Sequence, residues 1–395
     1  MLVVGSLAVF TPFVGLPSET FVARHVNELA PGRTLTVATR MGMPASPTWA
    51  ASGPVVDLDG TPPPSGVRWL ATRIAARLRG TSAGRYRWAP STADLRVLDA
   101  AFTEHDVSVV MTEFLDVWLP LVPWLRARGV RVVAHAHGND ISVRLRSPFW
   151  RNGYAAYDDV DAVVTVSEVS RRRLIDLGIT GERIHVIPCG VDVPQDAPDQ
   201  RPERDTVEVV AVGRMVPKKH PLATIEAFAL ASVHEPRLRL TMIGDGPLLD
   251  DARAAVAQSG LDDRVQLLGQ RPHADALQKM RESDIFVQHS VVSPVDGDEE
   301  GLPVGVLEAM AFALPVVSTR HAGIPEAVEE GVTGVLANEG DVHATAAALI
   351  DLTRDRDKRR AFGLAGHARA LDRFSAVREC RDLRALLGVD VGAGA

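Results

Sequence analysis

The chain has 395 residues, too many for one ordinary hydrophobic core and a length that fits two domains. Hydrophobic residues make up 46% of it, which argues against a disordered chain. The net charge of -7 argues against a general nucleic-acid-binding protein, because such proteins usually carry a strongly basic domain.

The first half of the chain alternates short apolar runs with helical patterns. We expect strands over residues 1–10, 34–38, 107–111, 131–136 and 162–166, and helices over residues 20–29, 116–128 and 168–177. The strand candidates are apolar throughout rather than at every second position, which is typical of parallel strands covered on both faces. The alternation therefore predicts a doubly wound parallel sheet.

A polar, proline-rich run over residues 194–202 divides the chain. A second alternating series follows, with strands expected over residues 207–213, 239–244, 265–269, 284–288 and 315–318. The sequence thus predicts an α/β protein with two Rossmann-like doubly wound domains, residues 1–194 and 203–373, which face each other across a ligand-binding cleft. A C-terminal helix within about residues 374–395 is expected to cross back to the first domain.

The sequence shows no sign of membrane insertion. The first 16 residues are apolar, but they lack a basic leading segment and an Ala-x-Ala pattern, so we expect a buried strand rather than a signal peptide. No run reaches 18 consecutive apolar residues, so no membrane-spanning segment is expected. Cys189 and Cys380 cannot form a disulfide framework, and the simplest expectation is a reduced, cytoplasmic protein.

An arginine-rich stretch over residues 67–88 allows two interpretations. Its apolar residues have helical spacing, and six arginines occur in residues 68–87 without an acidic residue. Basic amphipathic helices with aromatic residues lie on anionic membranes, which predicts peripheral association with the inner face of the cell membrane. The alternative is a solvated arginine-rich face over a core stripe.

Two carboxylates flank an expected helix start in the second domain. Pro303 suits the first turn of a helix, which places Glu300 in the preceding loop. Glu308 then lies one turn beyond Val304, on the same side of the helix. The amides expected to point out of this helix start, where the dipole favours an anion, belong to Gly301, Leu302 and Val304. The segment suits a diphosphate on its amides and sugar hydroxyls on its carboxylates; the alternative is an ordinary helix with a solvated glutamate at either end.

Cationic residues follow the first expected strand of the second domain. Gly213 and Arg214 are followed by Lys218 and Lys219, two of only four lysines in the chain. Arg214 and Lys219 are suited to stabilising the charge of a leaving diphosphate without a metal. Solvated loop charges are the alternative for both, and Lys218 fits a solvent-facing side chain equally well.

A glycine turn and an acidic run also lie in this domain. Gly244 and Gly246 half-match a dinucleotide-binding fingerprint, but Leu249 occupies the third glycine position, which argues against NAD. A tight strand-to-helix turn and a nucleotide contact remain open for the two glycines. The acidic residues at 296–299 fit a solvated loop rim better than a metal site.

These segments, in this order, resemble the group 1 glycosyltransferases, the family 4 type of the retaining GT-B class. The carrying motifs are Gly213-Arg214 with Lys219, the turn at Gly244, Glu300 with Glu308, and His321-Ala-Gly-Ile-Pro-Glu326. In the first half, Ser18-Glu19-Thr-Phe and His137-Gly-Asn-Asp140 are similar to segments of the colanic-acid and exopolysaccharide members. The resemblance runs over nearly the whole chain, with Cys189 where asparagine is usual and His220 where glycine is common.

The resemblance implies a role for each matching residue. Glu300 is expected to contact hydroxyls of the donor sugar and Glu308 the ribose, while Arg214 and Lys219 hold the diphosphate. His137 is expected to face the reacting sugar. The remaining expected contacts are Gly213, Lys218, Gly244, Gly246 and the 301–304 segment on the donor side, and Ser18, Glu19 and Asp140 on the acceptor side.

His137 has two further interpretations. His135 and His137 lie two apart at a strand end and share a face, so with Asp140 they fit a metal site. A satisfied loop histidine is the other alternative. We expect no metal and no cofactor.

The implied activity is hexosyl transfer, with retention, from a nucleoside diphosphate sugar to a glycan, a lipid-linked or a small-molecule acceptor. A UDP-sugar is favoured over a GDP-sugar as the donor. A GT-B sugar-nucleotide epimerase or hydrolase is one alternative, and a non-catalytic sugar-nucleotide-binding protein is the other.

Overall fold

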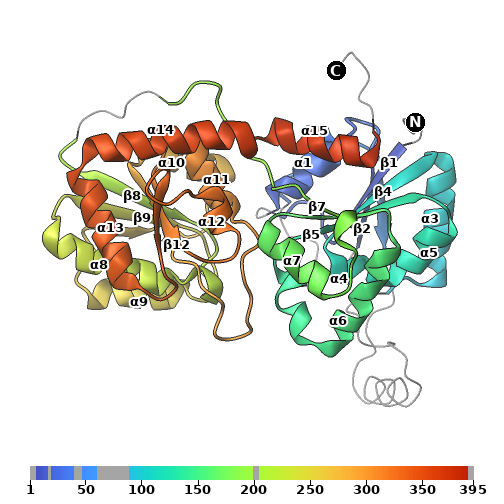
Figure 1. The fold of residues 1–395 in the computed structure, drawn as a ribbon, viewed down its shortest axis with the longest axis horizontal. Helices are drawn as coiled ribbons and strands as arrows, with labels where there is room; N and C mark the ends of the chain where they lie inside the picture. The colour runs from blue at the N-terminus through green and yellow to red at the C-terminus, as the bar shows by residue number, and fades with distance from the viewer. Residues whose placement is uncertain (1–5, 17–18, 40–46, 60–88, 199–203, 390–395) are drawn as a thin grey trace. The chain divides into compact units, whose positions relative to one another are not determined.

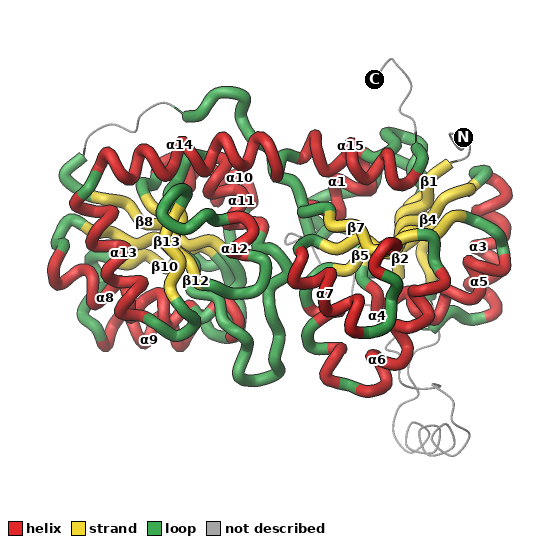
Figure 2. Tube along the Cα trace, in the orientation of Figure 1, coloured by secondary structure: helices red, strands yellow, loops and turns green. Residues whose placement is uncertain are grey.

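The computed structural model describes residues 6–16, 19–39, 47–59, 89–198 and 204–389 of the chain. It contains two compact units, each with one parallel sheet and helices packed around it (Figures 1 and 2). The first unit comprises the residues up to Val166, Ser170–Ile187 and the residues from Cys380 onward. The second comprises Ser167–Val169 and Pro188–Glu379.

The sheet of the first unit has seven strands in the order β3-β2-β1-β4-β5-β6-β7, and each neighbouring pair is parallel. Val110 lies opposite Ala8 on one side and Val132 on the other, which sets the register at the centre of the sheet. Both β2 and β6 are buried along their whole length, as expected for strands covered on both faces. The strands are β1 (Ser6–Thr11), β2 (Leu35–Thr39), β3 (Val55–Leu58), β4 (Val107–Glu113), β5 (Arg131–Ala136), β6 (Ala162–Thr165) and β7 (Ile184–Val186).

Most described helices of the first half are short, and one expected helix is broken. Residues 116–128 form two α-helices separated by a 3-10 turn, because Pro120 and Pro123 have no N–H to continue the helical hydrogen bonds. The described helices are α1 (Thr20–Glu28), α3 (Thr92–Glu104), α4 (Leu115–Trp118), α5 (Val122–Ala127), α6 (Pro148–Gly153) and α7 (Glu168–Asp176). Short 3-10 turns are η1 (Leu119–Leu121), η2 (Asn139–Ile141), η3 (Arg144–Arg146), η4 (Tyr154–Asp159) and η5 (Gly181–Arg183).

The sheet of the second unit has six parallel strands in the order β10-β9-β8-β11-β12-β13. The strands are β8 (Val207–Val212), β9 (Leu238–Ile243), β10 (Val265–Leu267), β11 (Ile285–Val287), β12 (Val316–Thr319) and β13 (Gly334–Ala337). The helices are α8 (Pro221–His234), α9 (Leu249–Gln258), α10 (His273–Glu282), α11 (Val304–Ala311), α12 (Ile324–Ala327), α13 (Val342–Arg354) and α14 (Arg356–Arg373), with a 3-10 turn η6 (Pro217–Lys219).

The last described helix, α15 (Ala376–Leu387), contributes to the core of the first unit. Cys380, Leu383 and Leu387 are buried there in one cluster with Leu7 and Val109. Apolar burial of this kind stabilises the attachment of the helix, because each fully buried aliphatic side chain contributes about 1.5 to 3 kcal/mol.

The expected strands are confirmed where the structure describes them, and the strand expected over residues 1–10 is described from Ser6 onward. Three described strands, β3, β7 and β13, are absent from the prediction. The arginine-rich stretch 67–88 lies outside the described residues. Within the described ranges, no helix is both long and apolar enough to cross a membrane.

Each sheet has one point from which its strand order runs outward in both directions. This point lies between β1 and β4 in the first unit and between β8 and β11 in the second. In open α/β sheets, ligands bind beyond the carboxyl ends of the strands at such a switch point. A binding site is therefore expected at the loops that leave β8 and β11 in the second unit, and at the ends of β4 and β5 in the first.

Candidate functional site

The loop that follows β8 carries the predicted cations Arg214 and Lys219. It leaves the sheet at Gly213 and ends in η6. Arg214 is exposed, whereas the Lys219 side chain is 17% exposed and its Nζ donates to Oε1 of Gln288 at 3.2 Å. Gln288 directly follows β11, so the two loops meet at the switch point, and residues of both line a pocket there.

Glu300 is the carboxylate that neutralises Lys219. Lys219 Nζ lies 3.0 Å from Glu300 Oε1, and Glu300 is buried. Burial alone would raise the pKa of Glu300, but the positive charges of Lys219 and Lys218 outweigh this effect and lower it to about 2. Glu300 is therefore ionised throughout the physiological range, and its oxygens act as hydrogen-bond acceptors.

Lys218 has a different role from its neighbour. Its side chain is buried, and Nζ lies 3.0 Å from Oδ2 of Asp298 and donates to the carbonyl oxygen of Glu299 at 3.0 Å. Lys218 is therefore not solvent-facing. It holds the acidic run that precedes Glu300, which includes Asp296, whose carboxylate accepts from the Ser293 hydroxyl.

The turn at Gly244 and Gly246, after β9, packs directly against the loop that follows β8 and carries Arg214 and Lys219, here called the cation loop. A Cβ atom on Gly244 would lie 1.9 Å from the carbonyl oxygen of Gly213, and one on Gly246 would lie 2.6 Å from that of Met215. The backbone carbonyl oxygen of Asp245 accepts the Met215 N–H at 2.9 Å. This contact explains both glycines as parts of a tight turn that supports the Gly213–Met215 backbone.

The start of α11 faces the same switch point. The helix begins at Val304, one residue later than the sequence predicts, with Pro303 in the N-cap position. A Cβ atom on Gly305 would lie 3.1 Å from the carbonyl oxygen of Val212, so this helix start lies beside the end of β8. Among the described residues, no acceptor is found for the N–H groups of Gly301, Leu302 and Val304. Free amides at a helix start bind anions.

His321 and Gly323 shape the loop that carries Glu300. The ring of His321 is fully buried; Nε2 accepts the Glu300 N–H at 3.1 Å, and Nδ1 lies 2.7 Å from Oε1 of Glu339. This network assigns the proton to Nδ1, which donates to Glu339. The N–H of Gly323 donates to the carbonyl oxygen of Gly301 at 3.1 Å, and a Cβ there would lie 2.4 Å from that oxygen.

Glu308 lies on α11, one turn after its start. Its side chain is 11% exposed, and Oε1 lies 2.7 Å from Nε2 of His273, the first residue of α10. The sequence gives no signal for this partner, because 35 positions separate the two residues. His273 fixes the orientation of the carboxylate that the resemblance assigns to the ribose.

The second unit therefore brings together most of the predicted donor-side residues. Arg214, Lys219, Glu300 and the open amides of α11 lie around the switch point, and Glu308 projects from the same helix. The cations and amides of this group are suited to holding an anion, and its two carboxylates are suited to accepting from hydroxyls.

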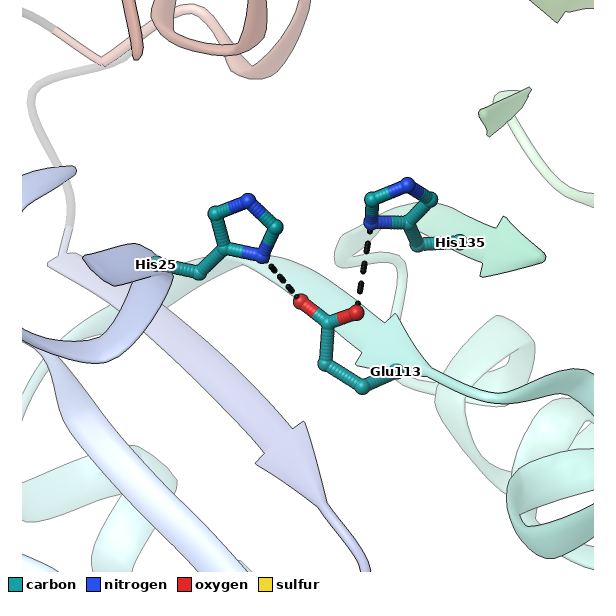
Figure 3. Close-up of side chains that lie close together, drawn as sticks. All are labelled: His25, Glu113 and His135. Carbon is teal, nitrogen blue, oxygen red and sulfur yellow. Dashed lines mark hydrogen bonds and ion pairs between the residues drawn. The ribbon is translucent and has the colours of Figure 1, made fainter. Parts of the chain in front are cut away.

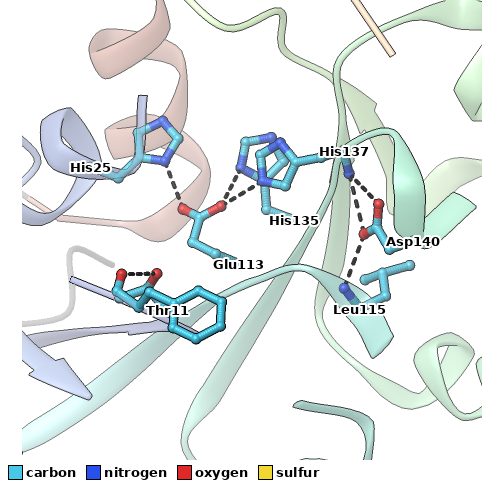
Figure 4. A network of polar contacts seen from close by, with 8 residues as sticks. Thr11, His25, Glu113, Leu115, His135, His137 and Asp140 are labelled. Atoms are coloured by element: carbon cyan, nitrogen blue, oxygen red, sulfur yellow. Dashed lines mark hydrogen bonds and ion pairs between the residues drawn. The ribbon is translucent and has the colours of Figure 1, made fainter. Parts of the chain in front are cut away.

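A separate polar cluster lies at the switch point of the first unit (Figure 3). Glu113 ends β4 and is fully buried. Its Oε1 lies 2.7 Å from Nδ1 of His25 on α1, and its Oε2 lies 3.2 Å from Nδ1 of His135 and 2.8 Å from Nε2 of His137. Three histidines thus surround one carboxylate (Figure 4). Neither His25 nor Glu113 was predicted from the sequence, where the one available signal was a charged residue that ends an apolar strand.

His137 is held in an aromatic enclosure. Its ring centroid lies 4.5 Å from that of Phe21, 4.6 Å from Phe114 and 4.2 Å from His135. Burial among these rings, together with repulsion from His135, outweighs the attraction of Glu113 and lowers the pKa of His137 to about 4. The ring is therefore neutral near pH 7.

Asp140 does not join the histidine rings. Its Oδ1 accepts the backbone N–H of His137 at 3.0 Å, and its Oδ2 accepts that of Leu115 at 3.0 Å. Burial and the negative charge of Asp116 raise the pKa of Asp140 to about 7, against these hydrogen bonds. The interpretation of His135, His137 and Asp140 as a metal triad is wrong, because Asp140 fixes the backbone and Glu113 occupies the place beside the rings.

The other predicted positions lie at helix starts, in the core or outside the described residues. Ser18 lies outside the described residues, and Glu19 occupies the N-cap position of α1. Cys189 and Cys380 are free and buried. His220, where glycine is common, has a φ of 42°, and its Nδ1 accepts the Ala223 N–H at the start of α8. Glycine is common at this position because it adopts the left-handed backbone without a steric penalty.

Two family models match the chain. The model for glycosyl transferases group 1 matches residues 193–369, and the model for glycosyltransferase family 4 matches residues 55–195. Together they span residues 55–369, which lie in both units.

The relatives found are sugar-transfer proteins. The amylovoran biosynthesis glycosyltransferase AmsK of Erwinia amylovora is 34% identical over 220 residues, 55% of this chain and 54% of AmsK, so the match spans little more than half of that relative. A GDP-mannose-dependent alpha-(1-6)-phosphatidylinositol monomannoside mannosyltransferase of Mycolicibacterium smegmatis is 30% identical over 285 residues, 69% of this chain and 74% of the relative.

Solved structures share the fold at low sequence identity. HepE of Anabaena, in complex with UDP-glucose, has a TM-score of 0.73 and 19% identity over 97% of this chain and 99% of that chain. Sucrose-phosphate synthase from Thermosynechococcus elongatus has a TM-score of 0.71 and 17% identity, over 97% of this chain and 98% of that chain. These likenesses confirm the predicted GT-B fold with two Rossmann-like domains. With both family models and a relative matched over most of its length, the chain belongs to the group 1 glycosyltransferases of family 4.

Proposed function

We propose that the chain is a retaining hexosyltransferase that uses a nucleoside diphosphate sugar, with a UDP-sugar as the first candidate donor. The acceptor is a hydroxyl of a glycan, a lipid-linked sugar or a small molecule. The observation that carries the proposal is the ion pair of Lys219 with Glu300, 3.0 Å apart, beside exposed Arg214 at the switch point of the second sheet.

The charges of this group match those of a nucleoside diphosphate. Arg214 and Lys219 supply two positive charges, and the amides at the start of α11 supply further donors for the phosphate oxygens. These cations do the work that a divalent metal does in other phosphate sites, so the proposed reaction needs no metal. Glu300 and Glu308 then accept hydrogen bonds from hydroxyls of the sugar and the ribose.

The proposed reaction breaks the bond between the anomeric carbon and the diphosphate oxygen and forms a bond from that carbon to the acceptor oxygen. The acceptor's proton passes to the departing diphosphate on the same face of the sugar. Negative charge on the diphosphate grows as the bond breaks, and Lys219 and Arg214 stabilise it. Preorganised donors of this kind contribute about 10²-fold to 10³-fold each to turnover.

GDP-mannose is the second candidate donor. The mycobacterial relative that supports it is named as GDP-mannose-dependent and is 30% identical over 69% of this chain. HepE was solved with UDP-glucose, but at 19% identity that likeness concerns the fold alone. The named activity of AmsK, in amylovoran biosynthesis, makes a growing polysaccharide the first acceptor class to test.

The test is a transfer assay with the full chain. UDP- and GDP-sugars are each incubated with and without oligosaccharide and lipid-linked acceptors, and the anomeric configuration of the product is read by NMR. The proposal predicts acceptor-dependent transfer with the donor's configuration kept. An inverted product contradicts the retaining mechanism. Donor consumption that does not depend on the acceptor favours the epimerase or hydrolase, and binding without turnover favours the non-catalytic alternative.

A further inference from the structure

The cluster around Glu113 is built from elements that are distant in the sequence. Glu113 ends β4, His135 lies opposite it in the register of β5, and His25 comes from α1, 88 positions before Glu113. The side chains of His25, Glu113 and His135 are completely buried, and that of His137 is 9% exposed. A buried carboxylate with three imidazoles is costly to maintain unless its hydrogen bonds are satisfied.

The backbone at the end of β4 also departs from ordinary geometry. Phe114 has a φ of 69° although it carries a large side chain, and its N–H donates to the carbonyl oxygen of His135 at 3.0 Å. Such strain persists where the surrounding structure imposes it, and it gathers at functional sites. The strained residue places its ring against His137, at a centroid distance of 4.6 Å.

The hydrogen bonds assign the protons of the cluster. The pKa of Glu113 lies well below its usual value because the attraction and hydrogen bonds of the surrounding histidines outweigh the effect of burial. An ionised carboxylate only accepts, so His25 donates from Nδ1 at 2.7 Å and His137 donates from Nε2 at 2.8 Å. Among the described residues, Nδ1 of His137 makes no hydrogen bond.

The distances of His25 and His137 from the carboxylate fit hydrogen bonds better than a bound metal ion, whereas Nδ1 of His135 lies farther away, at 3.2 Å. A tetrahedral zinc ion with ligands at about 2.0 to 2.1 Å keeps neighbouring ligand atoms about 3.3 Å apart. His25 and His137 approach the carboxylate to 2.7 and 2.8 Å, which is hydrogen-bond distance. Each of these two nitrogens points at a carboxylate oxygen of Glu113 and forms a hydrogen bond with it.

We propose that Glu113 is a positioning residue, which holds His137 with its proton on Nε2 and so leaves Nδ1 as a hydrogen-bond acceptor for a ligand hydroxyl. His25 holds the second carboxylate oxygen and prevents it from turning away. The ligand hydroxyl belongs to the sugar of the proposed transfer, so this part of the inference rests on the proposed function. The tautomer of His137 does not depend on the proposed function.

The tautomer decides what His137 recognises. A neutral ring with its proton on Nε2 offers a lone pair at Nδ1 and accepts from a hydroxyl, whereas the opposite tautomer offers a donor there. A carboxylate partner fixes such a choice, as carboxylates do for histidines that bind metals or act in catalysis. Glutamine at position 113 cannot accept from both histidines, because its amide has one acceptor and one donor end.

The first measurement is the histidine tautomer in the full-length wild-type chain, by long-range proton–nitrogen NMR at neutral pH. The His137 signals are assigned by their loss in His137→Gln. The proposal predicts a single form with the proton on Nε2. A wild-type His137 with its proton on Nδ1 overturns it, whatever the activity of the protein. One equivalent of zinc per purified chain also overturns it in favour of a metal site.

The second measurement uses Glu113→Gln, with Glu235→Gln as the matched control. Glu235 is also buried, but it pairs with Arg354 in the second unit, far in sequence from the cluster. Glu113→Gln is expected to destroy the single tautomer of His137 and to lower kcat/KM for transfer at least about tenfold. Binding of UDP without a sugar is expected to stay unchanged, because the second unit holds the diphosphate.

The two measurements distinguish a failure of the positioning role of Glu113 from a failure of the proposed function. An unchanged His137 tautomer in folded Glu113→Gln contradicts the positioning role. A changed tautomer in a protein that neither binds nor uses any sugar nucleotide contradicts the proposed function but leaves the positioning role intact. If Glu113→Gln does not fold, His25→Gln provides the second variant, with a mobile carboxylate and a mixed His137 tautomer as the expected result.

Discussion

Lys219 Nζ lies 3.0 Å from Glu300 Oε1, and these two residues come from the loops that leave neighbouring strands β8 and β11. The pair is mostly buried, with side chains 17% and 9% exposed. In the free protein, each charge therefore stabilises the other at the place where a diphosphate and a sugar are proposed to bind. A ligand that takes over Lys219 frees Glu300 to accept from hydroxyls.

Replacing Lys219 by methionine is expected to reduce both activity and stability. Transfer should fall by a factor on the order of 10² to 10³, because a donor to the leaving group is lost. The free energy of unfolding in urea should fall by about 3 to 5 kcal/mol, since Glu300 remains buried without its partner.

Two further variants separate these effects. Adding Glu300→Gln to Lys219→Met should recover part of the stability but none of the activity. Lys358→Met removes a partly exposed lysine that pairs with exposed Asp351, and it should change stability by no more than about 0.5 kcal/mol. Full activity in Lys219→Met would show that this lysine does not contact the leaving group.

Gly244→Ala tests whether the glycine turn supports the cation loop. The new Cβ would lie 1.9 Å from the carbonyl oxygen of Gly213, at a φ of 143° that a side chain rarely adopts. We expect a loss of more than about 1 kcal/mol in unfolding free energy and weaker nucleotide binding, because the Gly213–Met215 backbone must move.

Gly366→Ala is the matched control for that substitution. Gly366 lies inside α14, and its added Cβ would meet no heavy atom closer than 3.7 Å. Alanine is the better helix former, so this variant should be neutral or up to about 1 kcal/mol more stable. Equal effects of the two substitutions would contradict a specific role for the turn.

Asp140 gives the first unit a distinct pH dependence. Its pKa is about 7 in the folded protein, above the ordinary value of 3.8, so the folded state binds the proton more tightly than the unfolded state. Its contribution to the free energy of unfolding is then most favourable below pH 4 and falls as the pH rises toward 7, by up to about 1.4 kcal/mol per unit.

The measurement compares wild type with Asp140→Asn by urea unfolding across this range. The stability of the wild type relative to the variant should fall by a few kcal/mol between about pH 5 and about pH 7.5. Asp262→Asn, at an exposed position, reports the general effect of removing one negative charge. A difference that stays constant with pH would show that the two backbone hydrogen bonds, rather than burial, control this carboxyl group.

The sequence predicted the second unit's site better than the first unit's. Glu300, Glu308, Arg214 and Lys219 lie in short segments whose spacing around a strand end or a helix start carries the information. Lys218 shows the limit of this reasoning, because no local pattern indicates that its ammonium group turns toward Asp298.

The cluster in the first unit could not be read from spacing. His25 and Glu113 are 88 positions apart, and only the packing of α1 against the sheet brings them together. The same limit applies to His273, which meets Glu308 across 35 positions. Local chemistry did decide some differences, since Pro120 and Pro123 divide a helix that the apolar spacing alone predicts as continuous.

The donor site proposed in the second unit is tested by calorimetric titration of the full chain with UDP, GDP, ADP and TDP and with their sugar conjugates. The variants are Arg214→Ala and Glu308→Gln, with Arg253→Ala as an exposed control that pairs only with Asp250 among the described residues. We expect one nucleotide class, UDP or GDP, to bind the wild type and the control. The same nucleotide should raise the free energy of unfolding by about 2.7 kcal/mol at a hundredfold excess over Kd. Arg214→Ala and Glu308→Gln should bind it at least about tenfold more weakly. If no nucleoside diphosphate or sugar conjugate binds the wild type, or if these two variants bind as tightly as it does, the donor site proposed in the second unit is wrong.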